Sequence, residues 1–222
     1  MSFWIALLIP VILAYIVGAT PFGWMAGRLR GVDLRQHGSG NIGATNTVRV
    51  LGKSWGLPVF ALDVLKGWLP VTGAAWWTTH QPVLASHLLA TQMVPVLAGM
   101  GAVMGHTFTF WLGFKGGKGV ATSAGVMLGL APAALGLALL VWAVAMKVCR
   151  YVSLSSILAA WALLVALAAD VWRTGKLNGP LLALSLLVAV LVTVRHRANL
   201  ARIAAGTEPK AGARKPQPPS VS

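Results

Sequence analysis

The chain has 222 residues, of which 57% are hydrophobic, and its mean hydropathy is +0.75. Because soluble domains are about 45–50% apolar, this composition excludes an ordinary soluble domain and predicts a membrane protein. The formal net charge of +14 would suit a nucleic-acid-binding protein, but the basic residues fall between apolar segments rather than along one polar face. We therefore expect anionic lipid headgroups and anionic small molecules as partners, and no nucleic acid.

Polar, Gly-rich or Pro-marked breaks divide the hydrophobic sequence into segments of helical length. The segments cover residues 3–27, 55–78, 86–111, 119–131, 133–148, 154–171 and 180–194. Pro132 is the weakest division, but one helix over 119–148 would reach about 45 Å, well beyond a hydrocarbon core of about 30 Å. We therefore predict an all-α polytopic membrane protein with seven transmembrane helices. Residues 1–208 are expected to form a single integral-membrane domain, and the basic, Pro-rich tail 209–222 to be disordered.

The distribution of Lys and Arg between these segments gives an orientation, because cytoplasmic loops carry the positive charge. The basic loops are the first (Arg28, Arg30, Arg35, Arg49, Lys53), the third (Lys115, Lys118), the fifth (Lys147, Arg150) and the segment after the last span (Arg195, Arg197, Arg202). The second and fourth connections have no Lys or Arg, and the sixth has only Arg173 and Lys176. This alternation predicts an N-terminus outside, a C-terminus in the cytoplasm, and polar Gly-rich loops on the cytoplasmic face.

The first cytoplasmic loop contains the sequence GSGNIGATNTVR, which has the composition of a phosphate-binding loop. Its glycines allow backbone N–H groups to converge on an anion, and its polar side chains add hydroxyl, amide and guanidinium donors. The residues concerned are Gly38, Ser39, Gly40, Asn41, Gly43, Thr45, Asn46 and Arg49. The alternative is a flexible polar connection, which would not need two Asn, Thr and Arg so close together.

The third loop, GHTFTFWLGFKGGKGVATSAG, repeats this chemistry. Gly116, Gly117 and Gly119 bracket Lys115 and Lys118, and the helix that begins at about Val120 adds its own preference for anions. Neither Gly-rich loop has the spacing of a Walker A motif, so nucleotide hydrolysis is disfavoured. For His106, at the end of the preceding segment, a packed or hydrogen-bonded role is favoured over a direct chemical one.

A third polar cluster, VRHRANLARIAAGTE, follows the last span. His196, Asn199 and Arg202 would share one face if the helix continued, whereas a juxtamembrane basic segment would leave Asn199 and Glu208 unexplained. In the fifth loop, Ser153, Ser155 and Ser156 stand at the start of a helix, and at least one is expected to cap it. 

Asp63 and Lys66 lie within the second apolar segment, where an isolated charge costs about 2.5–3.5 kcal/mol. Their i, i+3 spacing predicts an ion pair. A structural intramembrane pair is the favoured interpretation, and an ion or proton path is the alternative.

The three clusters together resemble the bacterial acyl-phosphate:glycerol-3-phosphate acyltransferases, the PlsY family, over almost the whole chain. The family's three motifs are matched by GSGNIGATNTVR, GHTFTFWLGFKGGKGVAT and HRANLARIAAGTE, and DVLKG at residues 63–67 also looks like a family feature. The resemblance implies a seven-helix enzyme of the bacterial inner membrane with its active site at the cytoplasmic face. It would make lysophosphatidate from acyl phosphate and glycerol 3-phosphate, and its functional partner would be the enzyme that supplies acyl phosphate.

The resemblance also assigns roles by position. Ser39, Asn41, Thr45 and Arg49 would bind anions, Lys118 with the Gly116–Gly117 turn would contact phosphate or carbonyl, and His196 and Asn199 would contact glycerol 3-phosphate. From the residues and the resemblance together, we predict catalytic roles for Lys118, Arg49, Ser39 and His196, and substrate or phosphate binding by Gly38, Gly40, Asn41, Thr45, Asn46, Lys115, Gly116, Gly117, Ser153 and Asn199. The sequence leaves open whether Ser153 or a neighbouring serine lines the site. Glu208 looks like the acid that ends the family's third motif and is expected to be structural.

An acyl phosphate is a mixed anhydride with a good leaving group, so we expect no metal and no cofactor. The chain has only four acidic residues and no His-x4-Asp pair, which leaves a substrate phosphate as the preferred base and His196 as the protein alternative. Two other classes compete with an enzyme. A small phosphate carrier should have its site near the midplane on broken helices, and a lipid-binding scaffold would not need the Asn and Gly of the loops.

Overall fold

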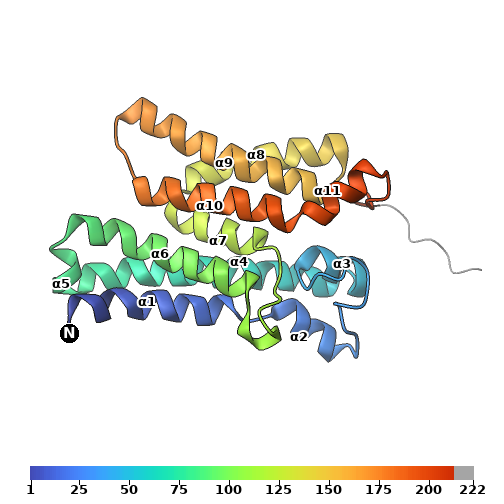
Figure 1. The fold of residues 1–222 in the computed structure, drawn as a ribbon, viewed down its shortest axis with the longest axis horizontal. Coiled ribbons are helices and arrows are strands. Elements are labelled where there is room, and N and C mark those ends of the chain that lie inside the picture. Colours follow the sequence, from blue (N-terminus) through green and yellow to red (C-terminus); the bar gives the residue numbers. More distant parts are fainter. Residues whose placement is uncertain (213–222) are drawn as a thin grey trace, which may run out of the picture.

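The computed structural model describes residues 1–212, in which the regular structure is entirely helical (Figure 1). Its helices are α1 (Phe3–Gly18), α2 (Phe22–Leu29), α3 (Ala44–Leu51), α4 (Lys53–His80), α5 (Pro82–Ala85), α6 (Leu88–Thr107), α7 (Val120–Leu130), α8 (Pro132–Cys149), α9 (Val152–Thr174), α10 (Gly179–Arg195) and α11 (Arg197–Ala204), with a 3-10 turn at Phe110–Leu112. Each of the seven predicted apolar segments contains a helix, so the all-α prediction is confirmed. Of the predicted tail, residues 213–222 lie outside the described part of the chain.

Four stretches are long and apolar enough to cross a membrane: Phe3–Leu29, Leu88–Leu112, Pro132–Cys149 and Val152–Thr174. A fifth is added if α10 and α11, which are bent by 51°, count as one broken span. Helix α4 has 28 residues but contains Asp63 and Lys66, and α7 has only 11 residues, or about 16 Å at 1.5 Å per residue. The seven-span arrangement and its orientation therefore remain predictions.

The first predicted segment, 3–27, is two helices rather than one. Pro21 lies at the break, where it removes a backbone N–H and disfavours a helical conformation at Thr20. The carbonyls freed by the break are bound by side chains distant in the sequence: Thr109 Oγ1, just after α6, donates to Ala19 O at 2.6 Å, and Lys66 Nζ of α4 donates to Thr20 O at 2.7 Å. The break is therefore stabilised by tertiary contacts.

Two other boundaries bear on the sequence analysis. The predicted division near Pro132 is confirmed, because α7 ends at Leu130 and Pro132 occupies the first turn of α8, where its missing N–H is tolerated. The third cluster, by contrast, does not lie on a helix that continues α10. That expectation is corrected: His196 separates α10 from α11, and its φ of −102° and ψ of 5° depart from helical values.

The helices form two groups that lie one above the other in Figure 1. Helices α1, α4 and α6 pack together in one group, α8, α9 and α10 pack in the other, and α7 contacts both. Helices α1 and α6 cross closely, since a Cβ on Gly18 would meet the backbone of Ala102. At one end of the molecule, on the right of Figure 1, lie α2, α3 and α11 together with the ends of α6 and α10. This end therefore contains all three polar clusters found in the sequence.

Candidate active site

Asn46 organises the first Gly-rich loop from within. Its side chain is 2% exposed, its Oδ1 accepts a hydrogen bond from Ser39 N at 2.8 Å, and its Nδ2 faces the carbonyls of Leu34, His37 and Asn41 at 3.2, 3.0 and 2.8 Å. These contacts engage both ends of the amide with the loop's own backbone. The structure thus gives Asn46 a positioning role, where the sequence analysis had placed it among the substrate-binding residues.

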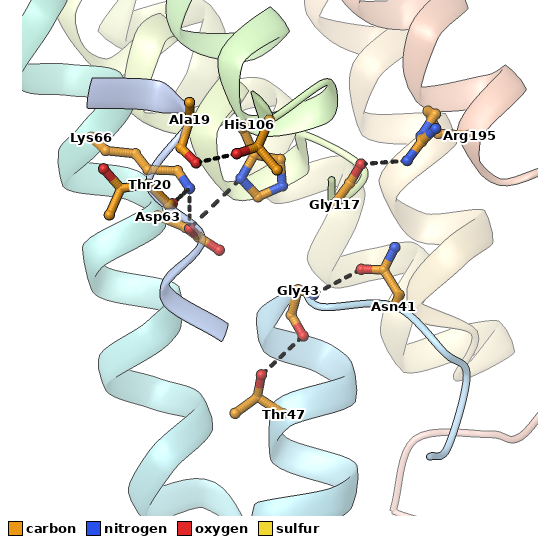
Figure 2. Close-up of polar contacts among 11 residues, drawn as sticks. Ala19, Thr20, Asn41, Gly43, Thr47, Asp63, Lys66, His106, Gly117 and Arg195 are labelled. Atoms are coloured by element: carbon orange, nitrogen blue, oxygen red, sulfur yellow. Dashed lines mark hydrogen bonds and ion pairs between the residues drawn. The ribbon is translucent and has the colours of Figure 1, made fainter. Parts of the chain in front are cut away.

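The start of α3 presents free donors beside this loop. Gly43 N donates to Asn41 Oδ1 at 2.8 Å, and Thr47 Oγ1 donates to Gly43 O at 3.2 Å, which fixes the first turn (Figure 2). The first N–H groups of a helix have no intrahelical partner and favour anions. The side chains of Ser39 and Arg49 are partly buried and Thr45 is exposed, and none of the three makes a side-chain hydrogen bond within residues 1–212. Their donors are therefore available to a ligand.

Two glycines of the loop are required by its shape. Gly38 and Gly40 have φ values of 63° and 70°, in the left-handed region that favours glycine. A Cβ on Gly38 would also collide with the Asn46 amide, and one on Gly40 would lie 3.2 Å from Arg35 O. These glycines therefore allow the backbone to close around Asn46.

The second Gly-rich loop is held between α6 and α10. Gly116 N donates to Thr107 O at 3.0 Å and Gly117 N to His106 O at 3.1 Å. Arg195 donates from its NH2 group to the carbonyls of both glycines at 2.9 Å, and Figure 2 shows its contact with Gly117. The N–H groups of Gly116 and Gly117 are thus already used. The backbone donors left for an anion are those of Lys118, Gly119 and the first turn of α7, and the exposed Lys115 lies just outside this turn.

Lys118 connects this loop to the third cluster through a chain of polar side chains. Its Nζ donates to Asn199 Oδ1, Asn199 Nδ2 donates to Glu208 Oε1 at 2.6 Å, and Glu208 Oε2 accepts from Arg202 Nε at 2.7 Å. Asn199 and Glu208 are 7% and 9% exposed. Glu208 is therefore a structural acid, as expected, and it fixes which way the Asn199 amide points.

Residues of all three clusters contribute to the electrostatics of Lys118. Burial, together with the charges of Arg202, Arg195 and Arg49, lowers the pKa of Lys118 to about 8, although Glu208 acts in the opposite direction. Charges from the first loop and from the segment around α10 and α11 therefore act on Lys118.

His196 lies beside Lys118 at the junction of α10 and α11 and is 4% exposed. Its Nδ1 is 2.8 Å from Val192 O; since a carbonyl only accepts, Nδ1 carries a proton and Nε2 is an acceptor. Burial and the charge of Lys118 lower the pKa of His196 to about 4. The imidazole is therefore neutral at pH 7.

The three serines at the start of α9 separate by their hydrogen bonds. Ser155 Oγ donates to Tyr151 O at 3.0 Å and Ser156 Oγ to Val152 O at 2.7 Å. Ser153 is 3% exposed and its hydroxyl has no hydrogen-bond partner within residues 1–212. Of the three, Ser153 is the one with a free hydroxyl. The expected helix cap by one of these serines does not form, because Ser155 and Ser156 bond back to carbonyls of the preceding turn and the cap position, Tyr151, makes no side-chain bond.

The predicted ion pair between Asp63 and Lys66 is present. Lys66 Nζ lies 2.7 Å from Asp63 Oδ1, and both side chains are 3% exposed. His106 Nδ1 lies 3.7 Å from the same oxygen, and the imidazole packs under Gly117 (Figure 2). This is the packed role that the sequence favoured for His106.

Two tertiary contacts were not predicted by the sequence analysis. Arg195 appeared there only as a juxtamembrane charge, and the contact of Arg195 with Gly116 and Gly117 joins positions about 80 residues apart. The start of the predicted tail also makes contacts, because Ala211 N donates to Arg150 O at 2.8 Å and Arg150 NH2 to Ala211 O at 2.9 Å. Local sequence contains no signal for either contact.

Comparison with known proteins gives the same relationship throughout the chain. The sequence profile of the family described as glycerol-3-phosphate acyltransferase matches residues 8–206. The glycerol-3-phosphate acyltransferase of Chlorobium phaeobacteroides is 42% identical over 88% of this chain and 92% of its own length, and that of Staphylococcus haemolyticus is 41% identical over 92% and 97%.

Comparison with solved structures indicates the same family. The chain is similar to the crystal structure of PlsY, an integral membrane glycerol 3-phosphate acyltransferase, in its glycerol 3-phosphate form, with a TM-score of 0.81 and 38% identity over 93% of this chain and 96% of that one. The lysophosphatidic acid form gives a TM-score of 0.76 and 36% identity over 92% and 94%. With three matching motifs at one end of an all-helical bundle, the chain belongs to the glycerol-3-phosphate acyltransferase family of integral membrane enzymes.

Proposed function

We propose that this protein transfers a fatty acyl group from acyl phosphate to the 1-hydroxyl of sn-glycerol 3-phosphate, giving lysophosphatidate and inorganic phosphate. The observation that carries the proposal is the group of cations around Lys118. Arg195 binds the carbonyls of Gly116 and Gly117 just before it, and Arg202 is linked to it through Asn199 and Glu208. The nearby carboxylate, Glu208, is occupied by Asn199 and Arg202, and the charges of Arg49, Arg195 and Arg202 lower the pKa of Lys118. A site with this excess of positive charge suits a reaction that brings two phosphate-bearing substrates together.

The chemistry requires positioning and charge stabilisation rather than a covalent enzyme intermediate. The glycerol oxygen attacks the acyl carbonyl carbon, the bond from that carbon to the phosphate oxygen breaks, and inorganic phosphate leaves. Lys118 and the free N–H groups at the start of α7 are placed to stabilise charge on the carbonyl oxygen and the leaving phosphate. Ser39, Arg49 and the first turn of α3 are assigned to a substrate phosphate, and the free hydroxyl of Ser153 to glycerol 3-phosphate.

The proton of the attacking hydroxyl goes to a substrate phosphate. A base is effective when its pKa is near the working pH, and the second pKa of a phosphate ester is about 6. His196, with its pKa lowered to about 4, would hold that proton weakly. Its neutral Nε2 is instead suited to accept a hydrogen bond that orients the hydroxyl.

The cellular setting follows from the same proposal. The protein is proposed to cross the bacterial inner membrane seven times as a single domain over residues 1–208, with its site facing the cytoplasm and without metal or cofactor. An enzyme that makes acyl phosphate would supply its donor. A carrier would need its site near the midplane, whereas the cations here lie in the turn before α7, in the last turns of α3 and α10, and on α11.

The test is turnover by the purified full-length protein in detergent micelles containing EDTA. With acyl phosphate and glycerol 3-phosphate, we expect lysophosphatidate and phosphate in equal amounts, measured by mass spectrometry and phosphate assay. With acyl-CoA as donor we expect no product. Equal use of the thioester, or activity lost on adding the chelator, would contradict the proposal.

A further inference from the structure

The Gly116–Gly117 turn packs on the end of α6, where it contacts the ring of His106. Gly117 lies against the imidazole so closely that a Cβ there would overlap Nε2, and a Cβ on Gly116 would overlap the His106 carbonyl. Arg195 binds the other side of the turn through both carbonyls. The direction in which Lys118 leaves this turn therefore depends on where the His106 ring lies.

Helix α4 places a carboxylate opposite that ring. Asp63 Oδ1 is 3.7 Å from His106 Nδ1 and 2.7 Å from Lys66 Nζ, and Lys66 reaches on to Thr20 O at the break between α1 and α2 (Figure 2). Asp63, Lys66 and His106 are 2%, 3% and 6% exposed. One turn of α4 thus connects the broken first segment to the turn that holds Lys118.

We infer that Asp63, Lys66 and His106 form a positioning cluster for Lys118, acting through the Gly116–Gly117 turn. A pair needed only for stability is replaceable, since exchanging a buried ion pair for neutral side chains of similar volume is often neutral or stabilising. A positioning role is not, because it needs the negatively charged Asp63 carboxylate opposite His106 and the Lys66 donor opposite Thr20 O. The cluster itself touches no reacting atom, and so these are positioning residues.

The decisive variant is Asp63→Asn combined with Lys66→Met, which removes both charges while keeping the side-chain volumes similar. Asp63→Asn alone should lower the thermal midpoint, because it leaves Lys66 charged and unpaired. In the combined variant we expect the midpoint to recover towards the wild-type value, while kcat stays about 10- to 100-fold low, as for a small misplacement of a catalytic group. The KM values should change by less than about threefold. The matched control is Asp170→Asn, in an exposed pair with Arg173 that has the same spacing, and it should leave both quantities unchanged.

Coupling to Lys118 distinguishes this role from its alternatives. In a Lys118→Ala background the combined change should reduce kcat by less than about threefold further, since the group that it positions is gone. An independent ion or proton path would instead give losses that multiply. Multiplying losses, or a combined variant with wild-type kcat, would overturn the inference.

The kcat and KM measurements rest on the proposed function, so a second measurement is chosen that does not require turnover. Hydrogen exchange of the backbone amides at residues 113–119 should become at least about tenfold faster in the combined variant if the turn no longer packs against His106. Unchanged exchange would contradict the inference whether or not acyl phosphate is the donor. If the combined variant fails to insert, His106→Phe keeps a ring under Gly117, removes the nitrogen facing Asp63, and supports or contradicts the inference by the same two measurements.

Discussion

The surroundings of Lys118 shift the pKa of its side chain. An ordinary lysine titrates near 10.4, but burial and three arginines lower the pKa of Lys118 to about 8, while Glu208 acts to raise it. A lysine in this range remains mostly protonated at neutral pH, and a bound phosphate stabilises its charge further. The site thus lowers the proton affinity of Lys118, and a bound anion would raise it again.

This gives a pH prediction with a defined sign. Because the cation is lost as pH rises through its folded pKa, kcat/KM should fall on the alkaline side with an apparent pKa near 8. Lys118→Arg should move that fall above pH 10, and Glu208→Gln should move it to lower pH, because the charge that raises the pKa of Lys118 is gone. A fall unchanged in both variants would mean that another group titrates.

Removing Lys118 altogether should act mainly on the chemical step. Losing one preorganised donor typically costs about 2.7–4 kcal/mol of barrier, so we expect Lys118→Ala to lower kcat about 100- to 1,000-fold in steady-state assays with each substrate varied. Lys147→Ala, an exposed lysine at the end of α8, is the matched control. A kcat within twofold of wild type for Lys118→Ala would contradict the role assigned here.

At the scale of elements, each Gly-rich loop is shaped by a group that was not predicted to shape it. In the first loop this group is Asn46, whose amide is surrounded by backbone, and in the second it is the end of α6 together with Arg195. Both loops therefore leave helix N-termini, at α3 and α7, as the free anion donors. Substitution within either loop should act through shape before it acts on substrate binding.

Gly117 provides the test of that idea. We expect Gly117→Ala to lower kcat more than tenfold and to lower the thermal midpoint, because its methyl group would overlap a ring that cannot move aside, and overpacking costs about 1–3 kcal/mol. Gly136→Ala, at an open position inside α8, should be neutral or slightly stabilising. Midpoint and kcat measured on both variants decide the matter, and equal behaviour of the two would rule out the packing argument.

Sequence alone predicted features that have local causes. The i, i+3 spacing gave the Asp63–Lys66 pair, and Pro132 gave the division between α7 and α8. It missed α2 and α3 as separate helices, since eight-residue helices within a polar loop or an apolar run have little periodicity of their own. It also missed the roles of Asn46 and Arg195, because tertiary contacts determine both.

The whole molecule places its polar chemistry at one end of an apolar bundle. The free donors near α3, the turn before α7 and the chain from Lys118 to Arg202 all lie where α2, α3 and α11 gather (Figure 1). The opposite end has α5 and the loop between α9 and α10, with one exposed ion pair, Asp170–Arg173. Such an arrangement suits an enzyme that takes one substrate from water and the other from lipid at a single membrane surface.

Orientation in the membrane is the corresponding prediction. The positive-inside rule places residues 28–53 in the cytoplasm and residues 81–87 outside. In a Cys149→Ser background, which removes the sole cysteine, we expect a cysteine introduced by Ser86→Cys to react with an impermeant maleimide in intact cells. One introduced by Gln36→Cys should react only after the cells are opened. Both positions are exposed and lie outside the proposed site, so differences in burial do not explain the contrast. Labelling at position 36 in intact cells would invert the topology and separate the site from any cytoplasmic substrate.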